Sequence, residues 1–451
     1  MKIVSLCGML GYGYEKKSLD VVKKMTDVDY IGTDAGSTDP GPCYLGAGKS
    51  FTNRNAVKRD LELVLPYAVQ KKIPLIIGTA GGSGAGVHVQ WTRTIIEEIA
   101  QANHLSFTMA IIETEVTKEY VKEKLRNGKV HEMGPGLKLT EENIDKCTHI
   151  VSQIGVGPFI EALKHKPDVI LCGRSCDTAI YAAPAIMNGM EEGPAIHMAK
   201  IMECGALCAE PMAAADMMVA TVNDKDSFTL EPPNPSRICT INRVAAHTMY
   251  EQGNPYFIYE PDGHADLREA HYEAVSDRAV KVSNCKFVKV KQPTLKIEGA
   301  MLAGYRTISI AGINDPVTIS KIDDLFEIVK KFVAGQMEGK ANPQEYTIML
   351  KKFGTPLPGS VVPELPDCNM GIVIDVVAKT QELANTVCAL CRSRLLHTDY
   401  PGRKSSAGNL AFPYSPSDIE CGAVYVFGIY HLVDVDDLLE TSKIDYVKVG
   451  A

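Results

Sequence analysis

The chain has 451 residues, of which 45% are hydrophobic and 23% are charged, and its formal net charge at pH 7 is -8. This composition is typical of a globular protein with a sizeable core, and it argues against a nucleic-acid binder, whose affinity depends on a basic surface. No apolar run approaches the ~20 residues that span a bilayer, and the first residues lack a signal-peptide cleavage pattern. The 13 scattered cysteines are typical of reduced thiols. We therefore expect a cytoplasmic protein without a membrane segment.

Short apolar runs alternate with amphipathic stretches in the first half of the chain. The predicted strands are Lys2–Leu6, Asp29–Thr33, Pro74–Gly78, Phe107–Ile112, His149–Gln153 and Asp168–Cys172. The helical periodicity between them covers Arg54–Lys71, Val89–Ala102, Lys118–Arg126 and Pro158–His165. Strands that alternate with helices form βαβ units. The pattern predicts an α/β fold, with a Rossmann-like, mostly parallel sheet and helices on both faces, over residues 1–215.

The second half has a different pattern. Phe228–Ser236 is rich in proline, which predicts neither a central strand nor a helix interior. The strands expected after it are Ala279–Val282, Lys286–Val290, Thr294–Glu298, Tyr305–Ala311, Tyr346–Lys352, Gly371–Val377 and Ala423–His431, with helices at Pro316–Val333 and Gln381–His397. This order predicts an α+β C-terminal domain over residues 216–451, with a long polar loop at 397–418.

Glycine-rich loops follow most strands of the first half. They contain CGMLGYGY, DAGSTDPGPCYLGAGKS, TAGGSGAGVH, IGVGPF and CGRSCDTA. In an open parallel sheet, ligands bind beyond the carboxyl ends of the strands, and glycine lets backbone amides approach a ligand closely. We therefore expect a pocket at this edge of the sheet.

The loop after the third strand holds Gly81, Gly82, Ser83 and Gly84 and leads into a helix near His88. Backbone amides at a helix N-terminus bind anions, so this loop is a candidate site for a carboxylate or a phosphate. The alternative is a tight turn that packs the helix on the sheet. The loop lacks the Lys-Ser/Thr pair of a Walker A motif, and the first loop of the chain departs from the glycine order of dinucleotide-binding folds.

Candidates for proton transfer lie in the same loops. Asp34 ends the second strand, and Asp177 follows Arg174 after the sixth. An arginine beside carboxylates can clamp a substrate carboxylate and hold a neighbouring Asp ionised. Asp34, Asp177 and His88 are therefore candidates for general acid–base work. For each Asp the alternative is a helix cap or a turn residue.

The sequence leaves cofactors open. Asp34 and Asp39 are candidate ligands for a divalent metal such as Mg²⁺, since hard cations prefer oxygen ligands. The cysteine pairs lack the histidine partners of a zinc site. In the late polar loop, Arg403 and Lys404 are candidates for a second anion contact. This loop is either a lid or an interface between copies of a homo-oligomer.

Several long segments are similar to the acyclic terpene utilisation (AtuA-type) family. They are DAGSTDPGPCYLGAGKSF, LIIGTAGGSGAG, HIVSQIGVGPFIEAL, VILCGRSCDTAI, LEPPNP and LLHTDYPGRKSSAGNLAFPYSPSD. The resemblance, closest to the branch with the DAGSTDPGP loop, implies a cytoplasmic catabolic protein that acts beside a small partner protein. It also implies substrates that are branched acids or their CoA thioesters. It assigns no catalytic residues.

Three functions follow from these observations. The first is a lyase or hydro-lyase for a small carboxylic acid or its CoA thioester, with the anion on the Gly81–Gly84 amides and Arg174 and with Asp34 or Asp177 moving a proton. The second is a non-catalytic subunit or scaffold that works with a small partner protein. The third is a nucleotide- or NAD-dependent enzyme.

Overall fold

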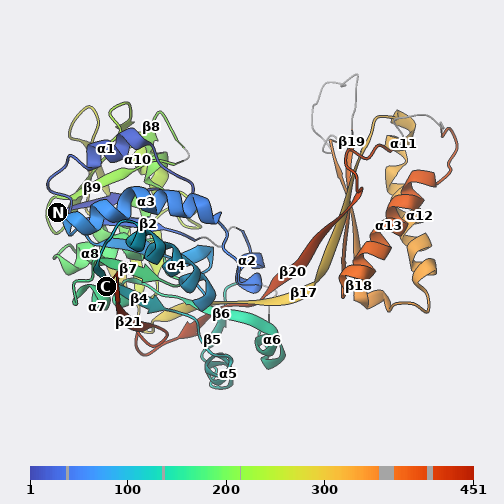
Figure 1. Ribbon diagram of the computed structural model, residues 1–451, viewed down its shortest axis with the longest axis horizontal. Helices are drawn as coiled ribbons and strands as arrows, with labels where there is room; N and C mark the ends of the chain where they lie inside the picture. The colour runs from blue at the N-terminus through green and yellow to red at the C-terminus, as the bar shows by residue number, and fades with distance from the viewer. Residues whose placement is uncertain (37–39, 135–137, 214, 355–369, 404–409, 451) are drawn as a thin grey trace. The chain divides into compact units, whose positions relative to one another are not determined.

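The computed structural model describes residues 1–36, 40–134, 138–213, 215–354, 370–403 and 410–450 (Figure 1). The chain divides into two compact units, one formed by residues 1–301 and 427–451 and the other by residues 302–426. The first unit thus extends beyond residue 215, where the change of sequence pattern placed a boundary. No helix among these residues is long and apolar enough to cross a membrane.

The first unit is built on a large mixed sheet, which confirms the predicted α/β class. Its parallel centre has the order β1, β2, β3, β7, β4, with the bounds Lys2–Ser5, Tyr30–Asp34, Leu75–Gly78, Val169–Cys172 and Phe107–Glu113. Antiparallel strands extend both sides of this centre. They are β9 (Met218–Val222), β10 (Ser227–Glu231), β15 (Val280–Ser283) and β14 (His271–Ala274) beyond β1, and β21 (Lys443–Val449) beyond β4.

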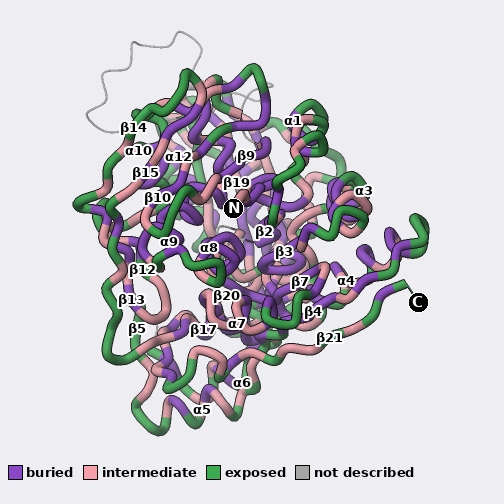
Figure 2. The backbone as a smooth tube through the Cα atoms, turned by 90° about the vertical axis from the view of Figure 1, so that its left-hand side faces the viewer, coloured by how far each residue is buried: buried purple, intermediate pink, exposed green. Residues whose placement is uncertain are grey.

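Helices cover both faces of this sheet, because its central strands are apolar on both sides. Along β3, Leu75 and Ile77 belong to one core cluster while Ile76 belongs to the other. The first cluster also contains residues of α1 (Lys16–Val22), α3 (Arg54–Lys71) and α4 (Gly86–Ala102). The second contains residues of α7 (Val156–Leu163), α8 (Ala179–Met187) and α9 (Glu192–Met202). Figure 2 shows the central strands of this sheet as mainly buried chain.

Two predictions for this unit were wrong. The segment at Phe228–Ser236 does contribute a strand inside the sheet, β10, which pairs with β9 and β15. Its prolines all follow Glu231, so the residues in the ladder keep their amide donors. The strand predicted at His149–Gln153 is β6 (Cys147–Gln153), and it pairs antiparallel with β17 rather than joining the parallel centre.

Shorter elements complete the first unit. They are α2 (Cys43–Ala47), η1 (Ala80–Gly82), α5 (Lys118–Arg126), β5 (Val130–Glu132), α6 (Glu141–Lys146), η2 (Gly205–Cys208), β8 (Ala209–Glu210), β11 (Ile238–Cys239), α10 (Ile241–Thr248), β12 (Phe257–Glu260), β13 (Gly263–Asp266) and β16 (Lys286–Lys289).

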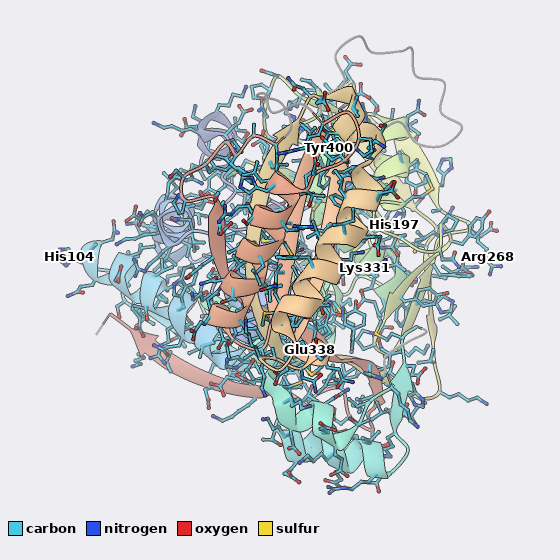
Figure 3. The ribbon with its side chains drawn as sticks, turned by 90° about the vertical axis from the view of Figure 1, so that its right-hand side faces the viewer. His104, His197, Arg268, Lys331, Glu338 and Tyr400 are labelled. Carbon is cyan, nitrogen blue, oxygen red and sulfur yellow. The ribbon has the colours of Figure 1, made fainter. Side chains whose placement is uncertain are left out.

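The second unit is a helix-covered antiparallel sheet. Its strands are β18 (Tyr346–Phe353), β19 (Met370–Ala378) and the parts of β17 (Thr294–Ile313) and β20 (Asp418–Asp434) that belong to it. The two strands predicted at 294–298 and 305–311 are thus one continuous strand. After α11 (Pro316–Ser320), α12 (Ile322–Met337) and α13 (Gln381–His397) pack side by side on β19. η3 (Pro343–Glu345) precedes β18. The exposed Lys331 marks the outer side of α12 in Figure 3.

Candidate functional site

A cavity of about 260 Å³ opens in the first unit at the carboxyl ends of β1 and β2. This is the edge of a parallel sheet at which ligands are expected. Its walls come from the loops after β1 and β2, the loop after β7, and the segments that follow α9 and α10. The lining residues are Gly8, Met9, Tyr12, Asp34, Gly36, Pro40, Phe51, Asp177, Glu203, Cys204, Leu207, Tyr250 and Glu251.

Asp34 is the last residue of β2, and its side chain is 2% exposed. Its main-chain carbonyl accepts a hydrogen bond from the Leu10 amide at 2.8 Å, which joins the two loops. Its carboxyl Oδ2 accepts a 3.4 Å hydrogen bond from the Gly36 amide, whereas Oδ1 has no partner. Burial, and next the charge of Asp177, raise the pKa of Asp34 well above its ordinary value, against the opposing effect of Arg174.

Asp177 presents a second carboxyl group to the same cavity. Its Oδ1 also has no hydrogen-bond partner. Burial raises the pKa of Asp177, although Arg174, Lys200 and Lys296 all act to lower it. Two neighbouring carboxyl groups with raised pKa values can share one proton, so that one group acts as an acid and the other as a base. The structure thus brings together the two aspartates that the sequence proposed for proton transfer.

Arg174 lies behind these carboxyl groups and does not line the cavity. It is 2% exposed, its Nε donates to Glu298 Oε2 at 3.1 Å, and its amide donates to Thr114 Oγ1 at 2.6 Å. Lys296 Nζ lies 2.7 Å from the other oxygen of Glu298. Arg174 therefore acts as a buried counter-charge for Asp34 and Asp177 rather than as an exposed clamp for a substrate.

Sequence reasoning missed Glu203, a third carboxyl group of the cavity. Glu203 is 4% exposed and pairs with Lys200, which is 6% exposed. Burial raises the pKa of Glu203 to about 8, and Asp177 is the next cause of this shift. The signal was present in the sequence, because Lys200 and Glu203 are the charged residues of an otherwise apolar stretch, AIHMAKIMECGALCA. Charged side chains in such an apolar stretch are buried only when they pair with each other or with another partner.

Comparison with known proteins assigns the chain to a protein family. The family model described as acyclic terpene utilisation family protein AtuA matches residues 49–403, which include Arg174, Asp177 and Glu203. The chain belongs to the acyclic terpene utilisation family. This confirms the resemblance seen in the sequence and gives the protein a role in acyclic terpene catabolism. No curated protein and no solved structure matches the chain.

In this family member the glycine-rich loop after β3 lies away from the cavity lining. The amide of Gly82 donates to Thr79 O at 3.1 Å, and that of Gly84 donates to Ala80 O at 3.0 Å. A Cβ at Gly84 would lie 2.1 Å from the Arg174 amide nitrogen. Gly81 packs in the same way against His88, and the amide of Ser83 points to Ala80 O. These glycines therefore allow close packing of the loop.

His88 is buried in the first turns of α4, and it too lies outside the cavity lining. Its Nε2 lies 3.0 Å from the carbonyl oxygen of Lys49, while Nδ1 has no partner. Burial lowers the pKa of His88. The side chain thus holds the Lys49 loop against α4, and the structure does not bring it together with Asp34 and Asp177.

Three candidates from the sequence remain. Arg403 belongs to the second unit, where its guanidinium donates to Leu396 O at 3.0 Å. Lys404 and Asp39 lie outside the described residues. Among the residues that are described, no group of three or more His, Cys, Asp or Glu side chains is arranged to hold a metal ion.

Proposed function

We propose that this protein is an enzyme that moves a proton on a small carboxylic acid or its CoA thioester in a lyase or hydro-lyase reaction. One observation carries the proposal. Asp34 and Asp177 line the same cavity, and each has a buried carboxyl oxygen without a hydrogen-bond partner. Unsatisfied buried carboxyl oxygens are costly for a protein to keep, and perturbed carboxyl groups in a cleft are typical of acid–base sites.

The chemistry follows from the unequal charge states of the two groups. The ionised carboxylate removes the proton next to the substrate carbonyl, and the electrons of that C–H bond form a carbon–carbon double bond. The bond to the leaving group on the adjacent carbon breaks, and the protonated carboxyl group supplies the proton that the leaving group needs. In a hydro-lyase the leaving group departs as water. Arg174 stabilises whichever aspartate is ionised.

The size and lining of the cavity support a small substrate. A volume of about 260 Å³ lies below the usual range for drug-sized ligands, so a CoA moiety would remain outside it. Met9, Phe51 and Leu207 supply apolar surface for a branched carbon skeleton. We do not place the substrate's anionic group on the loop after β3, because amides of that loop already donate to acceptors within the protein.

A hydrogen-exchange experiment tests the proposal. The purified protein is incubated in D₂O with branched C5 and C6 acids and with their CoA thioesters, and deuterium at the carbon next to the carbonyl is followed by NMR. We expect exchange with one class of compound, and a loss of about 100-fold or more in Asp177→Asn. Asp20→Asn is the matched control, because Asp20 is an exposed residue of α1.

Two results would contradict this function. Exchange that Asp177→Asn leaves intact would remove Asp177 from the reaction. No exchange and no ligand binding by the chain alone, together with a saturable complex with a small partner protein, would instead favour a non-catalytic subunit.

A further inference from the structure

The charges around the cavity do not balance. Arg174 and Lys296 both contact Glu298, so this group of three has one positive charge left over. That single charge faces two carboxyl groups, Asp34 and Asp177. Lys200 pairs with Glu203 and also acts on Asp177. When Asp34, Asp177 and Glu203 are all ionised, one negative charge of this group lacks a counter-charge.

The described lining of the cavity offers acceptors and no cations to a ligand. None of the described residues that line it is Lys, Arg or His, whereas Asp34, Asp177, Glu203 and Glu251 all do so. The carboxyl groups of Asp34 and Asp177 accept hydrogen bonds when they are ionised, and each keeps one buried oxygen without a partner. A ligand group that pairs with these carboxyl groups must donate hydrogen bonds, and a positive charge on it would supply the missing counter-charge.

Aromatic rings complete this environment. Tyr12 and Phe51 line the cavity with their ring centroids 6.4 Å apart, and Tyr250 lines it as well. The Tyr250 ring already lies 5.9 Å from one ammonium group, that of Lys200. Aromatic faces attract organic cations at exposed sites too, and Tyr12 is 58% and Tyr250 37% exposed.

We propose that the cavity is a subsite for a protonated amine, so that the substrate is an amino-substituted carboxylic acid or its thioester. This inference rests on the proposed function for the acid part of the substrate, but the amine subsite stands on the cavity alone. The raised pKa values of Asp34 and Asp177 agree with it, because a proton neutralises the unbalanced pair while the cavity is free. A bound ammonium group takes over that role and displaces the proton.

The test compares ligands with one carbon skeleton and different end groups. 3-Methylbutylamine, 3-methylbutan-1-ol and 3-methylbutanoate are titrated into the protein by calorimetry near pH 7, in two buffers with different enthalpies of ionisation. We expect the amine to bind at least about tenfold more tightly than the alcohol, and the carboxylate to bind least, because of the unpaired negative charge. The amine should release about one proton on binding, and the alcohol none.

Variants make the test specific to the aspartates. Asp177→Asn should weaken amine binding by about tenfold or more and abolish the proton release, because Arg174 then balances Asp34 alone. Asp34→Asn should do the same, which guards against misfolding of one variant, and Asp20→Asn should change neither quantity. Binding of the carboxylate as tightly as the amine would overturn the proposal, as would equal binding of amine and alcohol without proton release.

The outcomes separate this inference from the proposed function. Amine binding without deuterium exchange in any acid or thioester, with amino-substituted ones included in the exchange test, would leave the subsite standing and remove the proposed reaction. Exchange in an acid that has no amino group, together with no amine binding, would keep the reaction and remove the subsite.

Discussion

The Glu115 carboxylate accepts a 2.7 Å hydrogen bond from the amide of Gly86, the first residue of α4. Its other oxygen lies 2.7 Å from Nδ1 of His149, on β6. The first amides of a helix lack partners within the helix, and a negative charge near them is stabilising. The anion at the start of α4 therefore comes from the protein's own chain.

We expect Glu115→Gln to lower the free energy of unfolding by about 1 kcal/mol near pH 6. Burial acts to raise the pKa of Glu115, but the hydrogen bonds from His149 and Gly86 outweigh it and the pKa is lowered. The hydrogen bond to Glu115 raises the pKa of His149. The stabilisation from Glu115 is lost as pH falls through its folded pKa, and that from His149 is lost as pH rises through its own.

Urea unfolding of Glu115→Gln at pH 6 and pH 9 checks this prediction. The loss of unfolding free energy should be smaller at pH 9, because the stabilisation from protonated His149 falls as pH rises. Glu123→Gln is the control, because Glu123 is an exposed residue of α5. An equal loss at both pH values would show that the ion pair with His149 contributes nothing.

Gly84→Ala should destabilise the protein by about 3 kcal/mol or more, because its methyl group would overlap the backbone at Arg174. Gly84 also has a φ of +73°. Gly128→Ala separates the two effects, since Gly128 has a φ of +66° but nothing within 4 Å of a Cβ. We expect about 1 kcal/mol there, from backbone strain alone. Similar midpoints of chemical denaturation for the two variants would contradict the packing role of Gly84.

Asp34→Asn should make the protein more stable at pH 8, by about 1 kcal/mol, while it removes activity. The folded pKa of Asp34 is raised above its unfolded value, so the folded state keeps a proton that the unfolded state loses. Stability then falls as pH rises from the unfolded pKa towards the folded one. The advantage of the variant should grow between pH 5 and pH 8, as measured by thermal unfolding. A variant that is less stable than the wild type at pH 8 would show that the carboxylate is needed for folding.

Local sequence patterns predicted many helices and strands, because hydrophobic periodicity and capping residues act within a short stretch of chain. Arg54–Lys71, Lys118–Arg126 and Gln381–His397 are helices with the expected bounds. Each begins after a residue whose side chain accepts a hydrogen bond from the helix backbone, namely Asn53, Thr117 and Thr380. Asp34 could be found in the same way, since it follows a buried strand.

The pairing of strands that lie far apart in the sequence could not be predicted from these local patterns. β6 pairs with β17, and the residue periodicity of Cys147–Gln153 does not indicate which strand is its partner. Glu203 enters the cavity from the end of α9, which is not one of the loops that follow a parallel strand. Asp34, Asp177 and Arg174 follow or end parallel strands and could therefore be predicted together, whereas the Lys200–Glu203 pair could not.

The pairing of β21 with β4 has a consequence for biosynthesis. β21 covers β4 along its whole length, from Phe107 to Glu113, and it is made after all of residues 302–426. During translation the apolar edge of β4 therefore stays without its neighbour until the second unit has been synthesised. An exposed edge of this kind invites pairing with other chains. A chain that ends before Lys443 would keep that edge open and would be prone to aggregate.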